Sequence, residues 1–158
     1  MSTPATERFV AAVEPLGLSV ELQTFPAETR TAQQAADALG CGVGQIVKSL
    51  VFKAGDELVM VLTSGANRVD TALAAPHFGV DKLGRADAAD ARAATGFAIG
   101  GIPPCGHPTQ LATVIDQDLL QYDCIWAAAG APVSVFALSP DDLVRVTGGT
   151  VAQVAAFA

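Results

Sequence analysis

The sequence is poor in charged residues and in the side chains that most often carry out chemistry. Of its 158 residues, 16% are charged, 6% are aromatic, three are cysteine and two are histidine. The cysteines form no C-x-x-C pair, so neither a disulfide framework nor a structural zinc site is expected. Cys105 and His107 would need further ligands to hold a metal, and His77 is the only other histidine, so we expect no metal site.

Long apolar runs are also absent, although 51% of the residues are hydrophobic. No uninterrupted apolar run approaches the roughly 18 residues of a membrane-spanning helix. Glu7, Arg8 and Glu14 interrupt the N-terminal segment where a secretory signal peptide would be apolar. The composition excludes a disordered chain. We therefore expect a soluble, cytoplasmic protein without a membrane partner, folded as a single domain over residues 1–158.

Basic residues are few and scattered. Nine lysines and arginines face sixteen acidic residues, and the net charge is −7. This balance argues against a broad nucleic-acid-binding surface. A nucleic-acid partner would have to be held locally, at one of its ends.

The residue pattern alternates between helices and strands without the regular βαβ order of a dinucleotide-binding fold. The run GCGVGQ precedes a strand and lacks the G-x-G-x-x-G spacing. We expect an α/β fold with one curved, mixed but mainly antiparallel sheet, barrel-like in outline and flanked by helices. Helices are predicted at 6–16, 31–40, 69–79 and 86–96, a helical turn at 139–141 and a closing helix at 150–157. Strands are predicted at 19–25, 46–53, 57–64, 110–116, 124–129 and 133–138.

A lysine interrupts an apolar strand face. Alternation in the strand at 46–53 places Lys48 on the same face as Ile46, Leu50 and Phe52. Taking an ammonium out of water costs several kcal/mol unless it is paired or its pKa falls. Two interpretations remain open: Lys48 extends its amine to water from near the strand end, or it lines a pocket for an anionic or ester ligand.

The segment GFAIGGIPPCGHP (96–108) is unusually rich in glycine and proline. Its prolines fix the backbone and its glycines allow close approach of a ligand. The backbone N–H groups of Gly100, Gly101 and Ile102 could hold a carbonyl oxygen as it becomes an oxyanion. The alternative is a tight corner before the next strand.

Several segments together resemble the YbaK / prolyl-tRNA-synthetase-associated editing domain family. They are QIVKSLVF, VLTSGANRVD, GGIPP, VIDQDLL, WAAAG and LVRVTGG, and they span nearly the whole chain. The resemblance implies a curved mixed sheet with flanking helices and hydrolysis of the ester that joins an amino acid to the 3′ end of tRNA. It points to tRNA(Pro) carrying a small wrong amino acid such as Ala or Cys, and it implies no metal and no organic cofactor. It makes Lys48 the residue required for activity, and Gly100 and Pro104 the fixed positions of a G-x-x-x-P loop.

These lines converge on one set of candidate residues. Lys48 and the backbone of Gly100, Gly101 and Ile102 are expected to act on the ester, with Lys48 as an anchor for phosphate or ester oxygens or as a general base. The expected substrate-contacting residues are Ile46, Leu50, Phe52, Asn67, Arg68, Ile99, Pro103, Pro104 and Asp116.

Two of these assignments have alternatives, and so does the choice of nucleophile. Asp116 either meets the substrate ammonium or caps the helical segment QDLLQ, and Asn67 and Arg68 either touch the tRNA end or form an exposed turn. A Cys105 nucleophile beside His107 is a further alternative.

The expected partners are the acceptor 3′ end of aminoacyl-tRNA and prolyl-tRNA synthetase or another translation factor. The competing functions are a non-catalytic module that binds aminoacyl-tRNA or a synthetase, and a small-molecule ester hydrolase.

Overall fold

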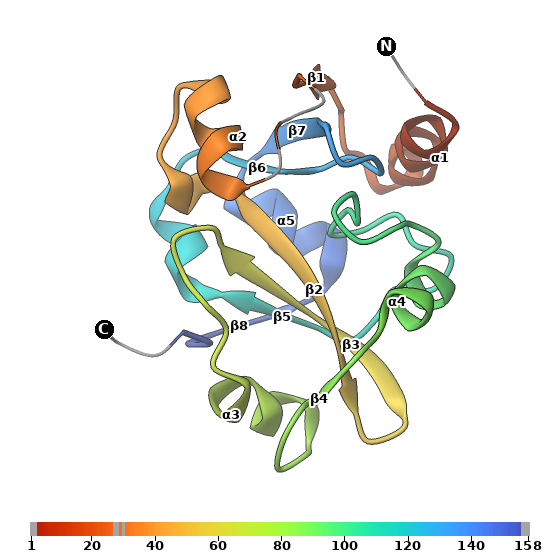
Figure 1. Cartoon of the computed structure of the whole chain (residues 1–158), viewed down its shortest axis with the longest axis vertical. Helices are drawn as coiled ribbons and strands as arrows, with labels where there is room; N and C mark the ends of the chain where they lie inside the picture. Colours follow the sequence, from red (N-terminus) through yellow and green to blue (C-terminus); the bar gives the residue numbers. More distant parts are fainter. Residues whose placement is uncertain (1–2, 27–28, 30, 156–158) are drawn as a thin grey trace.

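Two β-sheets with helices packed around them form the fold in the computed structural model, which describes residues 3–26, 29 and 31–155 (Figure 1). The α-helices are α1 (Pro4–Val13), α2 (Ala32–Leu39), α3 (Thr71–Ala74), α4 (Ala88–Thr95) and α5 (Pro140–Thr147). The 3-10 helices are η1 (Glu14–Leu16), η2 (Val43–Gln45), η3 (Ala75–Phe78) and η4 (Gln117–Gln121). The strands are β1 (Gln23–Thr24), β2 (Val47–Ala54), β3 (Glu57–Ser64), β4 (Gly84–Arg85), β5 (Thr113–Asp116), β6 (Ile125–Ala128), β7 (Ser134–Leu138) and β8 (Thr150–Ala152).

The strand pairing is mixed and mainly antiparallel, as predicted. The larger sheet has the order β4-β2-β3-β5-β8, in which β3–β5 and β5–β8 are parallel. The smaller sheet has the order β1-β7-β6 and is antiparallel throughout. The expected single sheet is thus divided in two, and a bridge between Ile46 and Trp126 joins the halves beside the start of β2. The barrel-like closure remains a prediction.

The hairpin of β2 and β3 is the centre of the larger sheet. β3 is buried on both faces from Val59 to Ser64. Met60 and Leu62 pack into the main core with residues of α1, α5 and the smaller sheet. Val59 and Val61, on the opposite face, pack into a second core beside α3. Side chains that alternate between two cores fix the register of this hairpin.

Local capping sets the helix boundaries where the sequence predicts them. Thr31 and Gln34 form a capping box at the start of α2, and Asp87 caps α4 through the Asp90 N–H. α5 follows its Ser139 cap and runs to Thr147, well beyond the single turn expected there. Of the helices in the described residues, none is long and apolar enough to cross a membrane.

The closing helix predicted over 150–157 is wrong, because Thr150–Ala152 forms strand β8 parallel to β5. Ala152 and Val154 alternate into the second core, and Ala155 bridges to Val69. Tertiary pairing with β5 therefore overrides the helical preference of the alanines. The last two residues of the predicted helix lie outside the described residues.

The strand predicted at 19–25 is much shorter than expected. Only Gln23 and Thr24 pair, with β7, whereas Val20 and Leu22 pack against the main core without joining a ladder. The two-residue strand β4, which pairs with the far end of β2, carries no sequence signal long enough to predict it. β4 covers only Phe52 and Lys53. Apart from the Ile46–Trp126 bridge just before its start, the first half of β2 therefore has no strand partner on that side within the described residues.

Candidate active site

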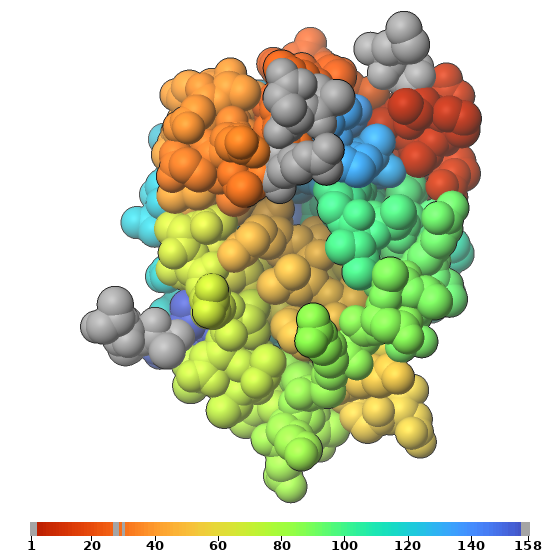
Figure 2. Space-filling model, in the orientation of Figure 1, coloured from red at the N-terminus to blue at the C-terminus, as the bar shows by residue number. Residues whose placement is uncertain are grey.

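A cavity of about 310 Å³ lies beside this uncovered first half of β2. Figure 2 shows the surface of β2, in light orange, between the olive segment that follows β3 and the green loop that follows α4. The cavity is mainly apolar. Its lining residues are Phe25, Thr29, Thr31, Ala32, Ala35, Ile46, Val47, Lys48, Ser49, Leu50, Ile99, Gly100, Ile102, Trp126, Ala128, Pro132 and Val135.

Lys48 lines this cavity and is half-buried. Its Nζ donates a hydrogen bond to the backbone oxygen of Asn67 over 2.6 Å. Burial, followed by the nearby Arg68 guanidinium, lowers the pKa of the Lys48 ammonium, and Asp116 opposes this shift. Lys48 thus contributes to the cavity wall, and its amine is held by the turn that follows β3.

The glycine-proline loop supplies another part of the same wall. Gly100 has a φ of 95°, which favours glycine, and lines the cavity with Ile102. A Cβ on Gly101 would lie 2.8 Å from backbone atoms of Ala131, so only glycine fits at this crossing of two loops. The two loops are also joined by the Gly130 N–H, which donates to the Gly101 oxygen over 3.0 Å.

The three candidate N–H donors of this loop differ in their availability. The Gly101 N–H donates to the Ala98 oxygen over 3.0 Å and is therefore engaged within the loop. The N–H groups of Gly100 and Ile102 donate to no acceptor among the described residues. Among the described residues, two of these three donors thus have no acceptor.

Pro103 and Pro104 of this loop are buried, whereas Pro108 is exposed. The Nε2–H of His107 donates to the Pro103 oxygen over 2.7 Å, and burial lowers the pKa of His107. Pro103 and Pro104 do not line the cavity, so their position fits a supporting role for the residues that do. Cys105 is also fully buried behind the wall, and burial raises the pKa of its thiol to about 12. A protonated thiol with no access to the cavity does not fit a nucleophile.

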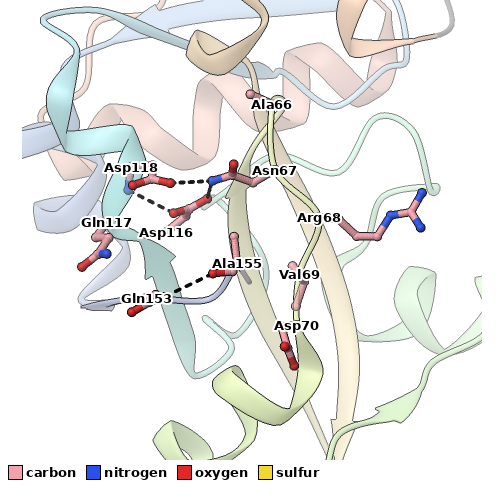
Figure 3. A pocket seen from close by; sticks show the side chains of 10 residues that line it. All are labelled: Ala66, Asn67, Arg68, Val69, Asp70, Asp116, Gln117, Asp118, Gln153 and Ala155. Atoms are coloured by element: carbon pink, nitrogen blue, oxygen red, sulfur yellow. Dashed lines mark hydrogen bonds between the residues drawn. The ribbon is translucent and has the colours of Figure 1, made fainter. Parts of the chain in front are cut away.

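A second, more polar cavity of about 500 Å³ is lined by Asn67 and its neighbours (Figure 3). Asp116 closes its floor and is only 1% exposed. Its Oδ1 accepts from the Asp118 N–H, which is the helix-capping alternative for this residue, and its Oδ2 accepts from Asn67. Arg68 is exposed, and its side chain points away from the two aspartates in Figure 3.

Most of the predicted site residues come together around these two cavities. Ile46, Lys48, Leu50, Ile99, Gly100 and Ile102 line the first cavity, and Asn67, Arg68 and Asp116 line the second. Phe52 lines neither cavity, because it packs against the second core beside Val59, its partner in β3. Sequence reasoning missed the wall formed by Phe25, α2 and Trp126; the single tryptophan of the chain was its one visible signal. No group of three potential metal ligands occurs within the described part of the chain.

Residues 26–146 match the family described as the aminoacyl-tRNA editing domain. The chain belongs to this family. The editing domain is 29% identical over 127 residues to the "Putative Cys-tRNA(Pro)/Cys-tRNA(Cys) deacylase EbsC" of Enterococcus faecalis, covering 78% of this chain and 76% of that protein. It is also 33% identical over 111 residues to the proline–tRNA ligase of Leuconostoc mesenteroides, covering 70% of this chain and 19% of the ligase.

Solved structures agree with this assignment. The crystal structure of "a putative trans-editing enzyme for prolyl tRNA synthetase" has a TM-score of 0.94 and 42% sequence identity, and the match covers 99% of this chain and 100% of that one. The protein described as hypothetical protein APE2540 has a TM-score of 0.83 and 28% identity over 94% of this chain. The editing domain is accordingly an aminoacyl-tRNA deacylase.

Proposed function

We propose that this editing domain acts in trans on tRNA(Pro) that carries a small non-cognate amino acid, such as alanine or cysteine, and hydrolyses the ester. The observation that carries the proposal is the meeting of Lys48 with the Gly100–Ile102 segment at one mainly apolar cavity. The names of the Enterococcus relative and of the trans-editing structure support tRNA(Pro) as the substrate. We place the activity in the cytoplasm, where tRNA is charged.

In the proposed reaction, the oxygen of a water molecule adds to the ester carbonyl. The N–H groups of Gly100 and Ile102, which have no acceptor among the described residues, stabilise the negative charge that develops on the carbonyl oxygen. The bond between the carbonyl carbon and the ribose oxygen then breaks, and the amino acid leaves as a carboxylic acid. A proton from the attacking water passes to the released ribose oxygen, which becomes a hydroxyl. The 3′-adenosine carries a neighbouring ribose hydroxyl that can orient the water, and an aminoacyl ester is already activated, so no protein nucleophile is needed.

Lys48 contributes its positive charge to this reaction. An ammonium beside the cavity can hold the terminal phosphate or the ester oxygens through charge-assisted hydrogen bonds. The alternative role, a general base, requires the neutral amine, and the lowered pKa of Lys48 brings that form closer to physiological pH. The two roles predict opposite pH dependence of the reaction rate.

The cavity walls give a basis for selecting the amino acid. Ile46, Leu50 and Ile102 form apolar surface around the space next to Lys48. Excluding a ring such as that of proline relies on shape, whereas one missing methylene is worth only about 1–3 kcal/mol. Ile99, which is 57% exposed, and Arg68 lie at the outer side and are the proposed contacts for the tRNA end.

Prolyl-tRNA synthetase is the proposed partner. The Leuconostoc proline–tRNA ligase contains a segment similar to this domain, which supports a link between this activity and proline charging. With a net charge of −7, the domain has little means of attracting tRNA from a distance. Capture of the substrate near a synthetase that releases it would remove this limitation.

The test is deacylation of tRNA(Pro) charged with alanine, cysteine, serine or proline, with the Lys48→Ala variant as the control. We expect loss of the alanyl or cysteinyl ester, retention of the prolyl ester, and a rate at least about 100-fold lower with Lys48→Ala. Stability of all four esters would refute the function. Hydrolysis that is unaffected by Lys48→Ala would keep the function and refute the mechanism.

A further inference from the structure

The position of the Lys48 ammonium depends on the turn that follows β3, whereas Lys48 itself lies in β2. Lys48 lies in β2, and its acceptor is the backbone oxygen of Asn67, three residues beyond the end of β3. The side chain is long and flexible, and this is the one hydrogen bond that its amine makes within the described residues. The location of the positive charge is therefore set by wherever the turn holds the Asn67 carbonyl.

The turn is fastened by one buried carboxylate. The Oδ2 atom of Asp116 accepts from the backbone N–H of Ser64 over 3.0 Å and from the side-chain amide of Asn67 over 2.9 Å. The same oxygen thus binds both ends of the Ser64–Asn67 turn, and Figure 3 shows its bond to the Asn67 side chain. The second N–H of the Asn67 amide donates to Asp118 over 2.8 Å, so both amide hydrogens are used.

Asp116 is itself held rigidly. It is the last residue of β5, pairs with Ala152 of β8, and is 1% exposed. Its other oxygen accepts from the Asp118 N–H over 3.0 Å. A carboxylate with three hydrogen bonds at the end of a central strand has little freedom to move, which is the usual property of groups that orient a functional side chain.

We propose that Asp116 is a positioning residue of the deacylase site, which acts through Asn67 to fix the carbonyl that holds the Lys48 ammonium at the cavity. This inference rests on the proposed function for its catalytic meaning. The charges around Lys48 agree with it: Asp116 favours the ammonium form, while burial and Arg68 disfavour it. Asp118 is bound to the same Asn67 amide and adds a second negative charge at the turn.

The first test is a double-mutant cycle with Asn67→Ala and Lys48→Met. Asn67→Ala removes both side-chain hydrogen bonds but keeps the backbone oxygen to which Lys48 donates, and the turn retains the bond from the residue 67 N–H to the Ser64 oxygen. We expect single-turnover deacylation to fall about tenfold in the wild-type background and less than about twofold in the Lys48→Met background. An equal loss in both backgrounds would mean that Asn67 acts only through general stability, and would overturn the proposal.

The second test does not depend on catalysis. Lysine labelled with 13C at Cε gives three signals, because the chain contains only Lys48, Lys53 and Lys82. We expect Asp116→Asn to lower the titration midpoint of the Lys48 signal, since it removes the negative charge that favours the ammonium, and Asn67→Ala to shift the Lys48 signal at neutral pH. The signals of Lys53 and Lys82 serve as internal references.

A matched control separates positioning from lost stability. Ser139→Ala removes the N-cap of α5, which lies outside both cavities, and should leave the Lys48 signal and the deacylation rate unchanged. If Asp116→Asn does not fold, Asn67→Ala decides the question alone. A Lys48 signal that is the same in Asn67→Ala and wild type would overturn the positioning role. A shifted signal without deacylation of any charged tRNA would uphold that role and refute the proposed function.

Discussion

Replacement of Lys48 by methionine separates the catalytic and structural contributions of this residue. Methionine keeps a long unbranched chain against the cavity wall but has no charge and no hydrogen-bond donor. Loss of one preorganised donor from a site that stabilises an oxyanion lowers kcat by about 10²–10³, or about 2.7–4 kcal/mol of transition-state stabilisation. We expect Lys48→Met to lower the deacylation rate by this factor.

The effect of Lys48→Met on stability should be small, because two terms oppose each other. The variant loses the hydrogen bond from Nζ to the Asn67 oxygen, which contributes about 1.5–3 kcal/mol for a charged donor. It also removes the cost of holding a half-buried ammonium, the cost that lowers the pKa of Lys48. We expect a net change below about 1 kcal/mol, and therefore a shift in Tm of less than about 2–4 °C for a chain of this size.

The assay combines single-turnover deacylation with thermal unfolding and extends to the pH dependence of the rate. If Lys48 acts as a cation, the rate falls as pH rises through its pKa, which burial places below that of a free lysine. A general base would instead give a rate that rises through the same range, after subtraction of the uncatalysed hydrolysis of the ester. A loss of less than about threefold in Lys48→Met, with normal folding, would refute the assignment of Lys48 as the residue that stabilises the transition state.

Three further predictions concern the glycine-proline loop at 96–108. Gly100 has a φ of 95°, so Gly100→Ala should destabilise the fold by about 1–3 kcal/mol and lower turnover at least about tenfold. The control is Gly55→Ala in the β2–β3 turn, where φ is 65°. It should cost similar stability without affecting turnover. Burial lowers the pKa of His107 in the folded state, so the native state loses stability as pH falls through the ordinary histidine pKa. His107→Gln should therefore reduce the fall in Tm between about pH 7.5 and 5. An equal fall in Tm in the variant and the wild type would contradict this. Cys105→Ala should keep turnover within about twofold and lower Tm, and an abolished rate in a folded variant would restore the nucleophile hypothesis.

The elements that the sequence predicted correctly are those fixed by local chemistry. The β2–β3 hairpin follows from two β-branched runs joined by a short turn, and α2 follows from the capping residues Thr31 and Gln34. β8 was missed because its strand character comes from pairing with β5, about 35 residues away in sequence. An alanine-rich segment contains no local sign of such a distant partner.

The candidate site, like the fold, has features that the local sequence predicts and features that depend on tertiary structure. Lys48 was conspicuous because a charge on an apolar strand face conflicts with its neighbours, and such conflicts mark functional positions. The Gly100–Ile102 loop was conspicuous through its composition. The engagement of the Gly101 N–H by Ala98, and the contribution of Trp126 to the cavity, depend on how separate segments meet in space, which single-sequence patterns do not encode.

The site has a consequence for how this domain can be selective. Its proposed chemistry uses two backbone N–H groups and one ammonium, and none of these changes with the amino acid on the tRNA. Discrimination between amino acids must therefore depend on fit. The amino acid has to fit between β2 and the loop in a position that also lets its ester carbonyl reach the N–H groups of Gly100 and Ile102. Because Gly101 is packed against Ala131 and Pro103 is bound by His107, the loop cannot easily retreat to admit a larger residue. In the proposed mechanism, the interactions that hold the loop rigid therefore set both the rate and the upper size of the substrate.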